Sequence, residues 1–479
     1  MNSNNTTKNT KNKKVTWAKT HLFEESILFI SVIKWSVLAS GIGILAGGAT
    51  ALFLQTLDFS IKFISPYNYF YLLLPLGLLL CIIISIYLAP ESEGHGTEKV
   101  IEAVHERSGR IPLKIAPIKF VITIITLATG GSVGKEGPCA QIGGSLASAT
   151  SSLLRLNDRE RRTLVICGIS AGFAAVFGTP VGGSIFALEV LFLGKMLYDV
   201  LFPSFISGIV GYLVARNLGI VYFHHTVDLI PKLSASMLVK SIFAGIIFGL
   251  TAYLLIETME FISRRLKGLR FSKPVVALIA GFIIVPLALL FSPESLGLGT
   301  ETMTAAIKGE EISLLTPLWK ILFTSLTLGG GGSGGIVTPL FYLGSTTGNI
   351  ISGLVGINSG TLAAMGMVAV LAGAANTPIA ASIMGIEMFG PDIGPYVAIS
   401  CITSFLIVGH RSVYGSQVIS LSKSATIKVH PEKGHGVAEE EVEFVIRAKS
   451  IVGLIKFLWL KGVRYKRKRA GKGEKQDEE

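Results

Sequence analysis

The chain has 479 residues, of which 50% are hydrophobic and only 15% are charged, and its mean hydropathy is +0.60. Because soluble proteins carry about 25% charged residues, this composition predicts an integral membrane protein and excludes an ordinary soluble enzyme. The four cysteines stand far apart without a CxxC pair, so we expect no disulfide framework, no metal site and no cofactor.

Residues 1–27 are polar and lysine-rich, and they form an N-terminal segment without the pattern of a cleavable signal peptide. Apolar runs then fill the chain from about 28 to 410. Since a spanning helix needs about 20 apolar residues, they predict roughly ten or more membrane segments. Two of them, 121–131 and 318–328, are short or interrupted, which favours broken helices over simple spans.

The net charge of +12 gathers at the N-terminus, in RRLKGLRFSK (264–273) and in RYKRKR (464–469). By the positive-inside rule, both termini and a loop at 258–273 are expected in the cytoplasm of a multi-pass protein of the cell (inner) membrane. A nucleic-acid site at 464–469 is the alternative to a basic cluster on anionic lipid. We expect the lipid contact and no nucleic-acid partner.

An internal repeat organises the apolar region. FGTPVGGSIFALEVLF (177–192) resembles ANTPIAASIMGIEMFG (375–390), with TP, SI and a glutamate at the same spacing. GGSVGKEGP (130–138) resembles GGSGGIVTP (331–339) at nearly the same separation. Each half is therefore one copy of a unit of about 200 residues, and such repeats in membrane proteins commonly have inverted topology.

The predicted fold is an all-α polytopic membrane protein made of two inverted repeats, 28–225 and 226–421, followed by a cytoplasmic basic tail at 422–479. In such proteins, broken or re-entrant helices meet near the midplane, and their N-termini form the functional site. Within the tail, SIVGLIKFLWLKGV (450–463) is expected to lie on the membrane surface.

The stretch GGSVGKEGP looks like a phosphate-binding loop but lacks its chemistry. A P-loop needs Ser or Thr after Gly-Lys, whereas Glu136 follows Gly134-Lys135 here. A nucleotide site is therefore excluded. The loop precedes a helix predicted over 138–154, and the N-terminus of a helix offers unpaired N–H groups to an anion.

Two further loops have the same form. GIVTPLFYLG (335–344) offers the amides of Ile336, Val337 and Thr338, and GHGTEKVIEAV (94–104) places His95 as a donor before an amphipathic helix. One helix end contributes at most about 2 kcal/mol, whereas burying a small ion in low dielectric costs on the order of 20 kcal/mol. Several converging helix ends are therefore expected to share one anion.

Glu136 is a carboxylate among donors meant for an anion. An intramembrane carboxylate is expensive and is a functional hypothesis by default. When ionised it can occupy the anion's place, and when protonated it would swing away, which predicts a gate. The alternative is a structural ion pair between Glu136 and Lys135.

These loops resemble those of the CLC family of chloride channels and chloride/proton exchangers, over roughly residues 30–420. The family motifs GSGIP, G(K/R)EGP and GxFxP correspond to GHGTE (94–98), GKEGP (134–138) and GIVTP (335–339), in the same order. The resemblance implies a homodimer with one pore per subunit that binds chloride or a similar small anion. It implies the gate at Glu136 and the following anion-binding residues: His95, Gly134, Lys135, Gly137, Ile336, Val337, Thr338 and Tyr414.

Three departures qualify the resemblance. His95 stands where the family often has Ser, either as a titratable donor or as a neutral replacement. Thr97-Glu98 replaces Ile-Pro in the first motif, and Val337 replaces an aromatic residue in the third. Because GKEGP is intact, whereas fluoride-specific relatives generally alter the first two motifs, chloride is the expected anion.

One further position bears on mechanism. Exchangers of the family usually carry an internal proton glutamate directly after the position of Glu189, where this chain has Val190. Valine cannot carry a proton, so the sequence favours a passive anion channel, with a chloride/proton antiporter as the alternative. Glu189 and Glu387, which recur in both repeats, are expected to be structural. A membrane enzyme or organic-solute carrier is a third hypothesis, but no nucleophile–base pair supports it.

Overall fold

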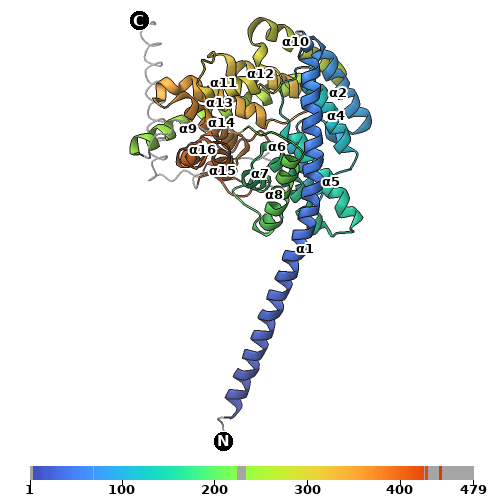
Figure 1. Ribbon diagram of the computed structural model, residues 1–479, viewed down its shortest axis with the longest axis vertical. Helices are drawn as coiled ribbons and strands as arrows, with labels where there is room; N and C mark the ends of the chain where they lie inside the picture. The colour runs from blue at the N-terminus through green and yellow to red at the C-terminus, as the bar shows by residue number, and fades with distance from the viewer. Residues whose placement is uncertain (1–3, 68, 224–233, 425–426, 430–441, 445–479) are drawn as a thin grey trace, which may run out of the picture.

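The computed structural model describes residues 4–67, 69–223, 234–424, 427–429 and 442–444 (Figure 1). Its α-helices are α1 Asn4–Ile64, α2 Leu74–Leu88, α3 Gly96–Glu106, α4 Ile115–Ala128, α5 Glu136–Leu153, α6 Asp158–Phe177, α7 Pro180–Glu189, α8 Leu201–Asn217, α9 Ala235–Lys267, α10 Lys273–Phe291, α11 Thr300–Lys308, α12 Thr316–Gly329, α13 Val337–Val355, α14 Ser359–Ala375, α15 Pro378–Phe389 and α16 Gly394–Val408. The short strands are β1 Phe192–Leu193, β2 Val418–Ile419, β3 Ile427–Val429 and β4 Val442–Phe444. The 3₁₀ helices are η1 Phe70–Leu73, η2 Pro90–Ser92, η3 Tyr198–Val200, η4 Pro293–Ser295 and η5 Pro391–Ile393.

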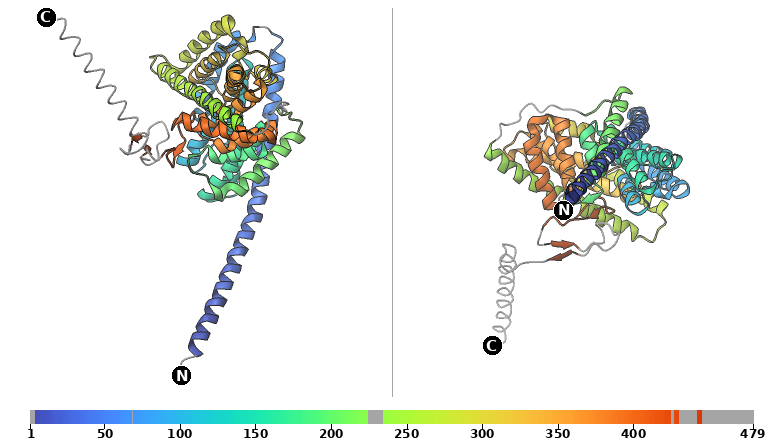
Figure 2. Two further views of the ribbon diagram at one scale, coloured as in Figure 1. Left: turned by 90° about the vertical axis from the view of Figure 1, so that its left-hand side faces the viewer. Right: turned by 90° about the horizontal axis from the view of Figure 1, so that it is seen from below.

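The α-helices of the described residues fall into two sets of eight, α1–α8 and α9–α16, in which a long first helix is followed by seven shorter ones in a similar order. In the right-hand view of Figure 2, the blue-to-cyan helices of the first set lie on one side and the orange helices of the second on the other. Helices at equivalent places in the two sets pack on each other, α2 against α10 and α7 against α15. The predicted polytopic fold of two repeats is confirmed.

Helix lengths agree with a mixture of full and broken spans. Six helical segments of the described residues are long and apolar enough to cross a membrane, and three shorter apolar helices accompany them. The short segments predicted at 121–131 and 318–328 are α4 and α12, each of 14 residues. At a rise of 1.5 Å per residue, 14 residues reach only about 21 Å, less than the hydrocarbon thickness.

The interior is built from helices that approach closely through small residues. A Cβ atom added to Gly143 in α5 would overlap the backbone of Gly168 in α6, and one added to Gly344 in α13 would overlap Gly366 in α14. Glycine at these crossings lets the two backbones meet, which is how helices pack where lipid removes the hydrophobic driving force. This packing holds α5 against α6 and α13 against α14, and the first residues of α5 and α13 are buried.

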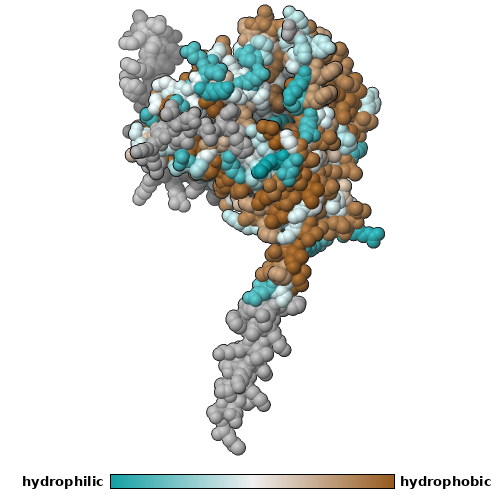
Figure 3. Space-filling view, in the orientation of Figure 1, coloured by the Kyte–Doolittle hydropathy of each residue, from teal (hydrophilic) through white to brown (hydrophobic). Residues whose placement is uncertain are grey.

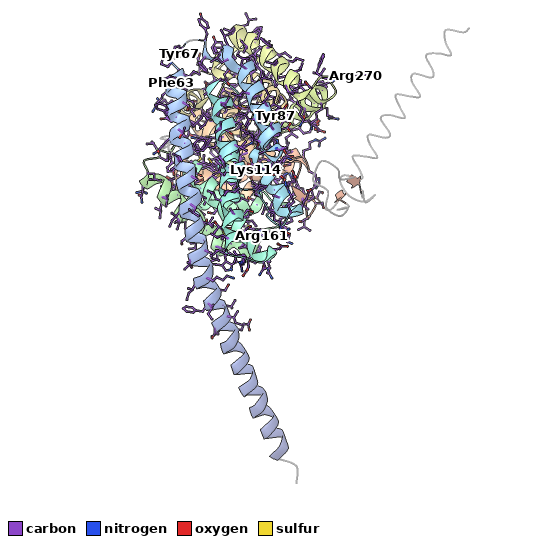
Figure 4. All side chains as sticks on the ribbon, turned by 90° about the vertical axis from the view of Figure 1, so that its right-hand side faces the viewer. Phe63, Tyr67, Tyr87, Lys114, Arg161 and Arg270 are labelled. Atoms are coloured by element: carbon purple, nitrogen blue, oxygen red, sulfur yellow. The ribbon has the colours of Figure 1, made fainter. Side chains whose placement is uncertain are left out.

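The outer surface is apolar over much of the body, as the brown areas of Figure 3 show. Exposed leucine, isoleucine and phenylalanine side chains are frequent on α1, α2, α9 and α10. A soluble monomer rarely exposes so much contiguous apolar surface, so this surface is the expected contact with lipid. In Figure 4, Phe63 and Tyr67 lie at one end of the body and Arg161 at the other.

One boundary differs from the sequence prediction. The segment 258–273 is not a loop, because α9 continues through Lys267 and only 268–272 join it to α10. The helix ends with Arg264, Arg265 and Lys267 in its last turn, where cations interact favourably with the helix dipole. The predicted division at 225/226 and the surface segment 450–463 lie outside the described residues.

Candidate anion site

Two glycine loops, one from each repeat, form the centre of the site. The amide of Gly134 donates to the carbonyl of Gly335 at 2.7 Å, and the amide of Gly335 donates back to Gly134 at 2.6 Å. A reciprocal pair of this kind relates two copies of one backbone device by a local two-fold axis. A Cβ atom on Gly335 would lie 2.7 Å from the Gly137 nitrogen, so this close approach requires glycine.

The third loop joins the same place from the first repeat. His95 is the N-cap of α3, and its backbone pairs with Gly334. The N-termini of α3, α5 and α13 therefore converge, which confirms the predicted arrangement of the three loops. Their first-turn amides have no acceptor within their own helices, so the centre of the protein presents positive partial charge from three directions.

Glu136 is the first residue of α5 and is 2% exposed. Its carboxylate accepts a hydrogen bond from the amide of Thr338 at 3.2 Å and another from the Thr338 hydroxyl. Lys135 is near enough to attract it, but the hydrogen bonds to this carboxylate come from Thr338. The amide of Thr338, expected to be free for an anion, is thus occupied by the side chain of Glu136.

The remaining predicted residues lie around this carboxylate. Lys135 and Ile336 are the N-caps of α5 and α13, and Val337 is the first residue of α13. The buried Tyr414 comes from the segment after α16, and its ring lies 6.0 Å from the ring of His95. The structure brings all the predicted positions to one region. Their roles as anion ligands stay predictions.

Several buried polar atoms at the site have no hydrogen-bond partner among the described residues: His95 Nδ1, Thr97 Oγ1, Gln141 Oε1 and Tyr414 Oη. The hydroxyls of Thr97 and Tyr414 approach each other without hydrogen-bond geometry. Leaving a buried polar group unpaired costs about 1–3 kcal/mol. Such a cluster is explained if a ligand or water completes the hydrogen bonds.

The two repeated glutamates lie outside this cluster. Glu189, at the end of α7, accepts from the amides of Ile379 and Ala380 at the start of α15. Glu387 accepts in the same way from Val181 and Gly182 at the start of α7. Each carboxylate caps the helix of the other repeat, as a structural role requires. That they carry no protons stays a prediction.

Val190 follows Glu189 and is 1% exposed. Its carbonyl accepts from the side chain of Gln417 at 3.1 Å, and β1 pairs with β2 just beyond. The backbone N–H of Gln417 in turn donates to the carbonyl of Tyr414. The position where family exchangers usually carry the internal proton glutamate is therefore hydrogen-bonded, through Gln417, to the segment that carries Tyr414.

The sequence reasoning missed two buried lysines. Lys119 in α4 donates to the carbonyls of Ser92 and Gly94, and Lys320 in α12 donates to those of Ser295 and Gly297. Both side chains are fully buried. The signal was present, because PESEGHGTE (90–98) matches PESLGLGTE (293–301) and each lysine starts a KxxxTxxT pattern.

The threonines of that pattern join the repeats. Ser132 donates from its amide to Thr327, and Ser333 does the same to Thr126, across the contact between the glycine loops. Among the described residues, no group of three or more His, Cys, Asp or Glu side chains could hold a metal ion. The histidines at 224, 225, 430 and 435 lie outside those residues.

Comparisons with known proteins agree with this geometry. The family profile described as voltage gated chloride channel matches residues 76–409. The chain belongs to this family, the CLC family. A chloride/fluoride channel protein of Pseudomonas syringae pv. tomato is 35% identical over 407 residues, which are 84% of this chain and 90% of that protein. The voltage-gated ClC-type chloride channel ClcB of Shigella flexneri is 27% identical over 65% of this chain and 77% of its own length.

Solved structures of the family are also similar. A CLC-type fluoride/proton antiporter superposes with a TM-score of 0.78 at 29% identity, covering 82% of this chain and 99% of that one. A slow cyanobacterial Cl⁻/H⁺ antiporter superposes with a TM-score of 0.68 at 20% identity, covering 78% and 94%. This CLC protein is therefore an integral membrane anion transport protein, and its relatives include both proteins described as channels and proteins described as antiporters.

Proposed function

We propose that this CLC protein exchanges small halide anions for protons through a site gated by Glu136. The observation that carries the proposal is the place of the Glu136 carboxylate, at the start of α5 and hydrogen-bonded by the amide and hydroxyl of Thr338 at the start of α13. Ionised, this side chain uses donors that an anion needs. Protonated, it loses its charge and its attraction for those donors, so anion entry and proton binding are linked.

The unpartnered hydroxyls of Thr97 and Tyr414 would complete the anion's hydrogen bonds, beside the backbone amides of His95, Lys135, Gly137, Ile336 and Val337. The amide of Gly134, which the sequence also predicted as an anion ligand, is already bound to the carbonyl of Gly335. Fluoride is the halide we favour. It is the smallest halide and the strongest hydrogen-bond acceptor, and it suits a site of N–H and O–H donors. Two of the similar proteins are described as handling fluoride. The intact GKEGP motif keeps chloride as the anion to compare with it.

A second candidate is a passive anion channel, with Glu136 as a gate that binds a proton without carrying it across. The specific observation that favours it is Val190, which is buried, apolar and next to Glu189. Glu189 does not take over the missing role in this arrangement, because both of its oxygens accept backbone amides of α15. The two candidates differ in one measurable quantity, the number of protons moved per anion.

The test uses the full chain in liposomes loaded with fluoride or chloride, with the external anion and pH followed together. Exchange predicts that an outward anion gradient drives protons uphill into the vesicle, and that Glu136→Gln abolishes this proton movement. A wild-type protein that passes anions but never moves protons uphill would leave the channel. If Glu136→Gln couples as the wild type does, the gate assignment is wrong.

The same preparation tests the remaining expectations. We propose a homodimer in the cell (inner) membrane with both termini in the cytoplasm, on the resemblance and the basic clusters at 264–273 and 464–469. Cross-linking in native membranes would give a dimer band. Protease added outside intact cells or right-side-out vesicles should leave both termini uncut, and cleavage there would reverse the orientation.

A further inference from the structure

We propose that His95 and Glu98 form a proton route that connects the anion site to the surface carrying Asp158 and Glu160, in place of the carboxylate absent at Val190. The inference rests on proton exchange as the proposed function. It deepens that function by assigning the path on one side of Glu136. The pair belongs to α3, the helix whose loop joins the two glycine loops at the centre.

His95 is the less exposed member of the pair and Glu98 the more exposed one. His95 Nε2 lies 3.1 Å from Glu98 Oε2, and the two side chains are 14% and 30% exposed. The other ring nitrogen, Nδ1, is buried and without a hydrogen-bond partner among the described residues. A histidine so placed has one nitrogen on a carboxylate and the other available to a further proton donor or acceptor.

The inner end of the route reaches the gate. The backbone of His95 pairs with Gly334, and a Cβ atom on the next residue, Gly335, would lie 3.1 Å from Glu136 Oε2. The ring of Tyr414 lies beside the imidazole, and its hydroxyl is within electrostatic reach of both Glu136 and Glu98. Water between these groups would complete the connection from Nδ1 to the Glu136 carboxylate.

The outer end reaches a charged surface. On α3, Lys99 pairs with Glu102, and Arg107 follows the helix with pairs to Glu91 and Glu102. Beyond it, Arg110 pairs with Asp158, the exposed first residue of α6. A small cavity of about 10 Å³ along this helix is lined by charged side chains such as Lys99 and Arg107 and by apolar ones such as Ile111. Glu98, whose side chain is 30% exposed, therefore stands between the less exposed histidine and the charged side of α3.

The charges around the histidine come from two helices. Burial is the largest influence and opposes the imidazolium form, as do the charges of Lys119 from α4 and Lys99 on α3, whereas Glu98 favours it. Tyr414 adds a neutral hydroxyl. The ring therefore rests in its neutral form, and the Glu98 carboxylate stabilises the imidazolium that forms during proton transfer.

A proton leaves Glu136 for the surface in three transfers. With Glu98 ionised, the Nε2–H bond of neutral His95 points at the carboxylate and Nδ1 is bare. Protonated Glu136 gives its proton, through water, to Nδ1, which leaves a Glu136 carboxylate and an imidazolium. The imidazolium passes the Nε2 proton to Glu98, and the resulting carboxylic acid releases it to water at the surface. Rotation of the ring or exchange with water restores the first tautomer, and the reverse sequence carries protons inward.

The second repeat provides a control that distinguishes proton transfer by Glu98 from stabilisation of the helix by its charge. A carboxylate in the first turn stabilises a helix by about 0.3–1 kcal/mol through the dipole. Glu98 serves in that way in α3, and Glu301 does so in α11 within the matching GTE sequence. The residue at the place of His95 is Leu298, so no relay can form there. Glu301→Gln is therefore the matched control for Glu98→Gln.

The experiment measures protons moved per anion in liposomes, with the wild type, Glu98→Gln, Glu98→Asp and Glu301→Gln. We expect proton movement in Glu98→Gln to fall by about 10-fold or more, partial recovery in Glu98→Asp, and wild-type coupling in Glu301→Gln. The dependence on pH at the Asp158 side should flatten in Glu98→Gln alone. His95→Gln provides the second variant, with the same expected loss, should Glu98→Gln not fold.

The outcomes separate this inference from the proposed function. A wild type that moves no protons overturns the exchange and the route together. A coupled wild type whose coupling survives in folded Glu98→Gln or His95→Gln overturns the route alone. An equal loss in Glu301→Gln overturns it as well, because the effect would then belong to the helix dipole.

Discussion

The loop before α3 reads PESEGHGTE and the loop before α11 reads PESLGLGTE, while the two glycine loops read GGSVGKEGP and GGSGGIVTP. The backbones of the two repeats are similar in two details. A buried lysine donates to the loop before α3 and another to the loop before α11, and the two glycine loops exchange a reciprocal pair of backbone hydrogen bonds. The side chains differ, because the first repeat has His95 and Glu136 where the second has Leu298 and Val337. Both repeats build the scaffold, and the titratable groups belong to the first.

The largest expected effect is a loss of thermal stability when either of the two equivalent glutamates, Glu189 or Glu387, is replaced. Glu189→Gln and Glu387→Gln each weaken two charge-assisted hydrogen bonds to a helix N-terminus in the other repeat. Since hydrogen bonds to charged groups contribute about 1.5–3 kcal/mol each, both variants should lower thermal stability in detergent by several degrees and to a similar extent. The protons moved per anion should remain those of the wild type. Loss of coupling in Glu189→Gln alone would make that residue a proton carrier and break the symmetry.

Lys119 and Lys320 make the same hydrogen bonds to backbone carbonyls in the two repeats, but we expect only Lys119 to affect anion binding. Lys119 holds the loop that ends at His95, and its charge acts on that ring. Lys320 holds the loop before α11, and its ammonium lies 4.7 Å from the ring of Tyr342.

We expect Lys119→Met to weaken anion binding by about 10-fold, equivalent to about 1.4 kcal/mol, and Lys320→Met to change it by less than about twofold. Calorimetric titration of fluoride and chloride measures the difference. Equal losses in the two variants would mean that neither charge acts on the site directly.

The Thr338 hydroxyl is the point where the second repeat restrains the gate of the first. Thr338→Val keeps the amide bond to Glu136 and removes the hydroxyl bond. A buried hydrogen bond contributes about 1 kcal/mol, or roughly fivefold in an equilibrium. We therefore expect anion flux at a pH where Glu136 is ionised to rise about fivefold. Thr338→Ser, which retains the hydroxyl, is the control, and a flux that rises equally in both would assign the change to packing.

Much of this was predictable from the sequence because repeats and helix starts leave local patterns. The TP…SI…Glu spacing predicted the internal repeat whose equivalent helices are α7 and α15, and the Gly-Lys-Glu-Gly-Pro loop predicted a helix that begins close to the start of α5. The contact between Glu136 and Thr338 was not predictable, because the residues are 202 positions apart and meet only when the repeats fold together. The bond from Nε2 of His95 to Glu98 is local, yet its meaning depends on the other nitrogen being unpartnered, which no spacing shows.

The smallest expected effect concerns the surface pair that joins α1 to the start of α6. Lys34 contacts Glu160, which is also the third residue of a capping box with Asn157. The Lys34 ammonium holds the pKa of Glu160 below its usual range. A depressed carboxyl pKa adds stability above the pKa of the unfolded chain, and this stability is lost as pH falls through the lower pKa of the folded state.

Glu160→Gln retains the capping box, since glutamine serves at that position, and removes only the charge pair, which as a surface ion pair is expected to contribute about 0.2–1 kcal/mol. The unfolding temperature at neutral pH should therefore drop slightly in low salt, and the difference from the wild type should vanish in acid and in high salt. An uncharged comparison in the second repeat is Ser359→Ala, the first residue of a helix that is capped by Asn358 and has no acidic residue in its first turn. A salt-dependent loss there as large as that of Glu160→Gln would show that the charge pair is not what distinguishes the two helix starts.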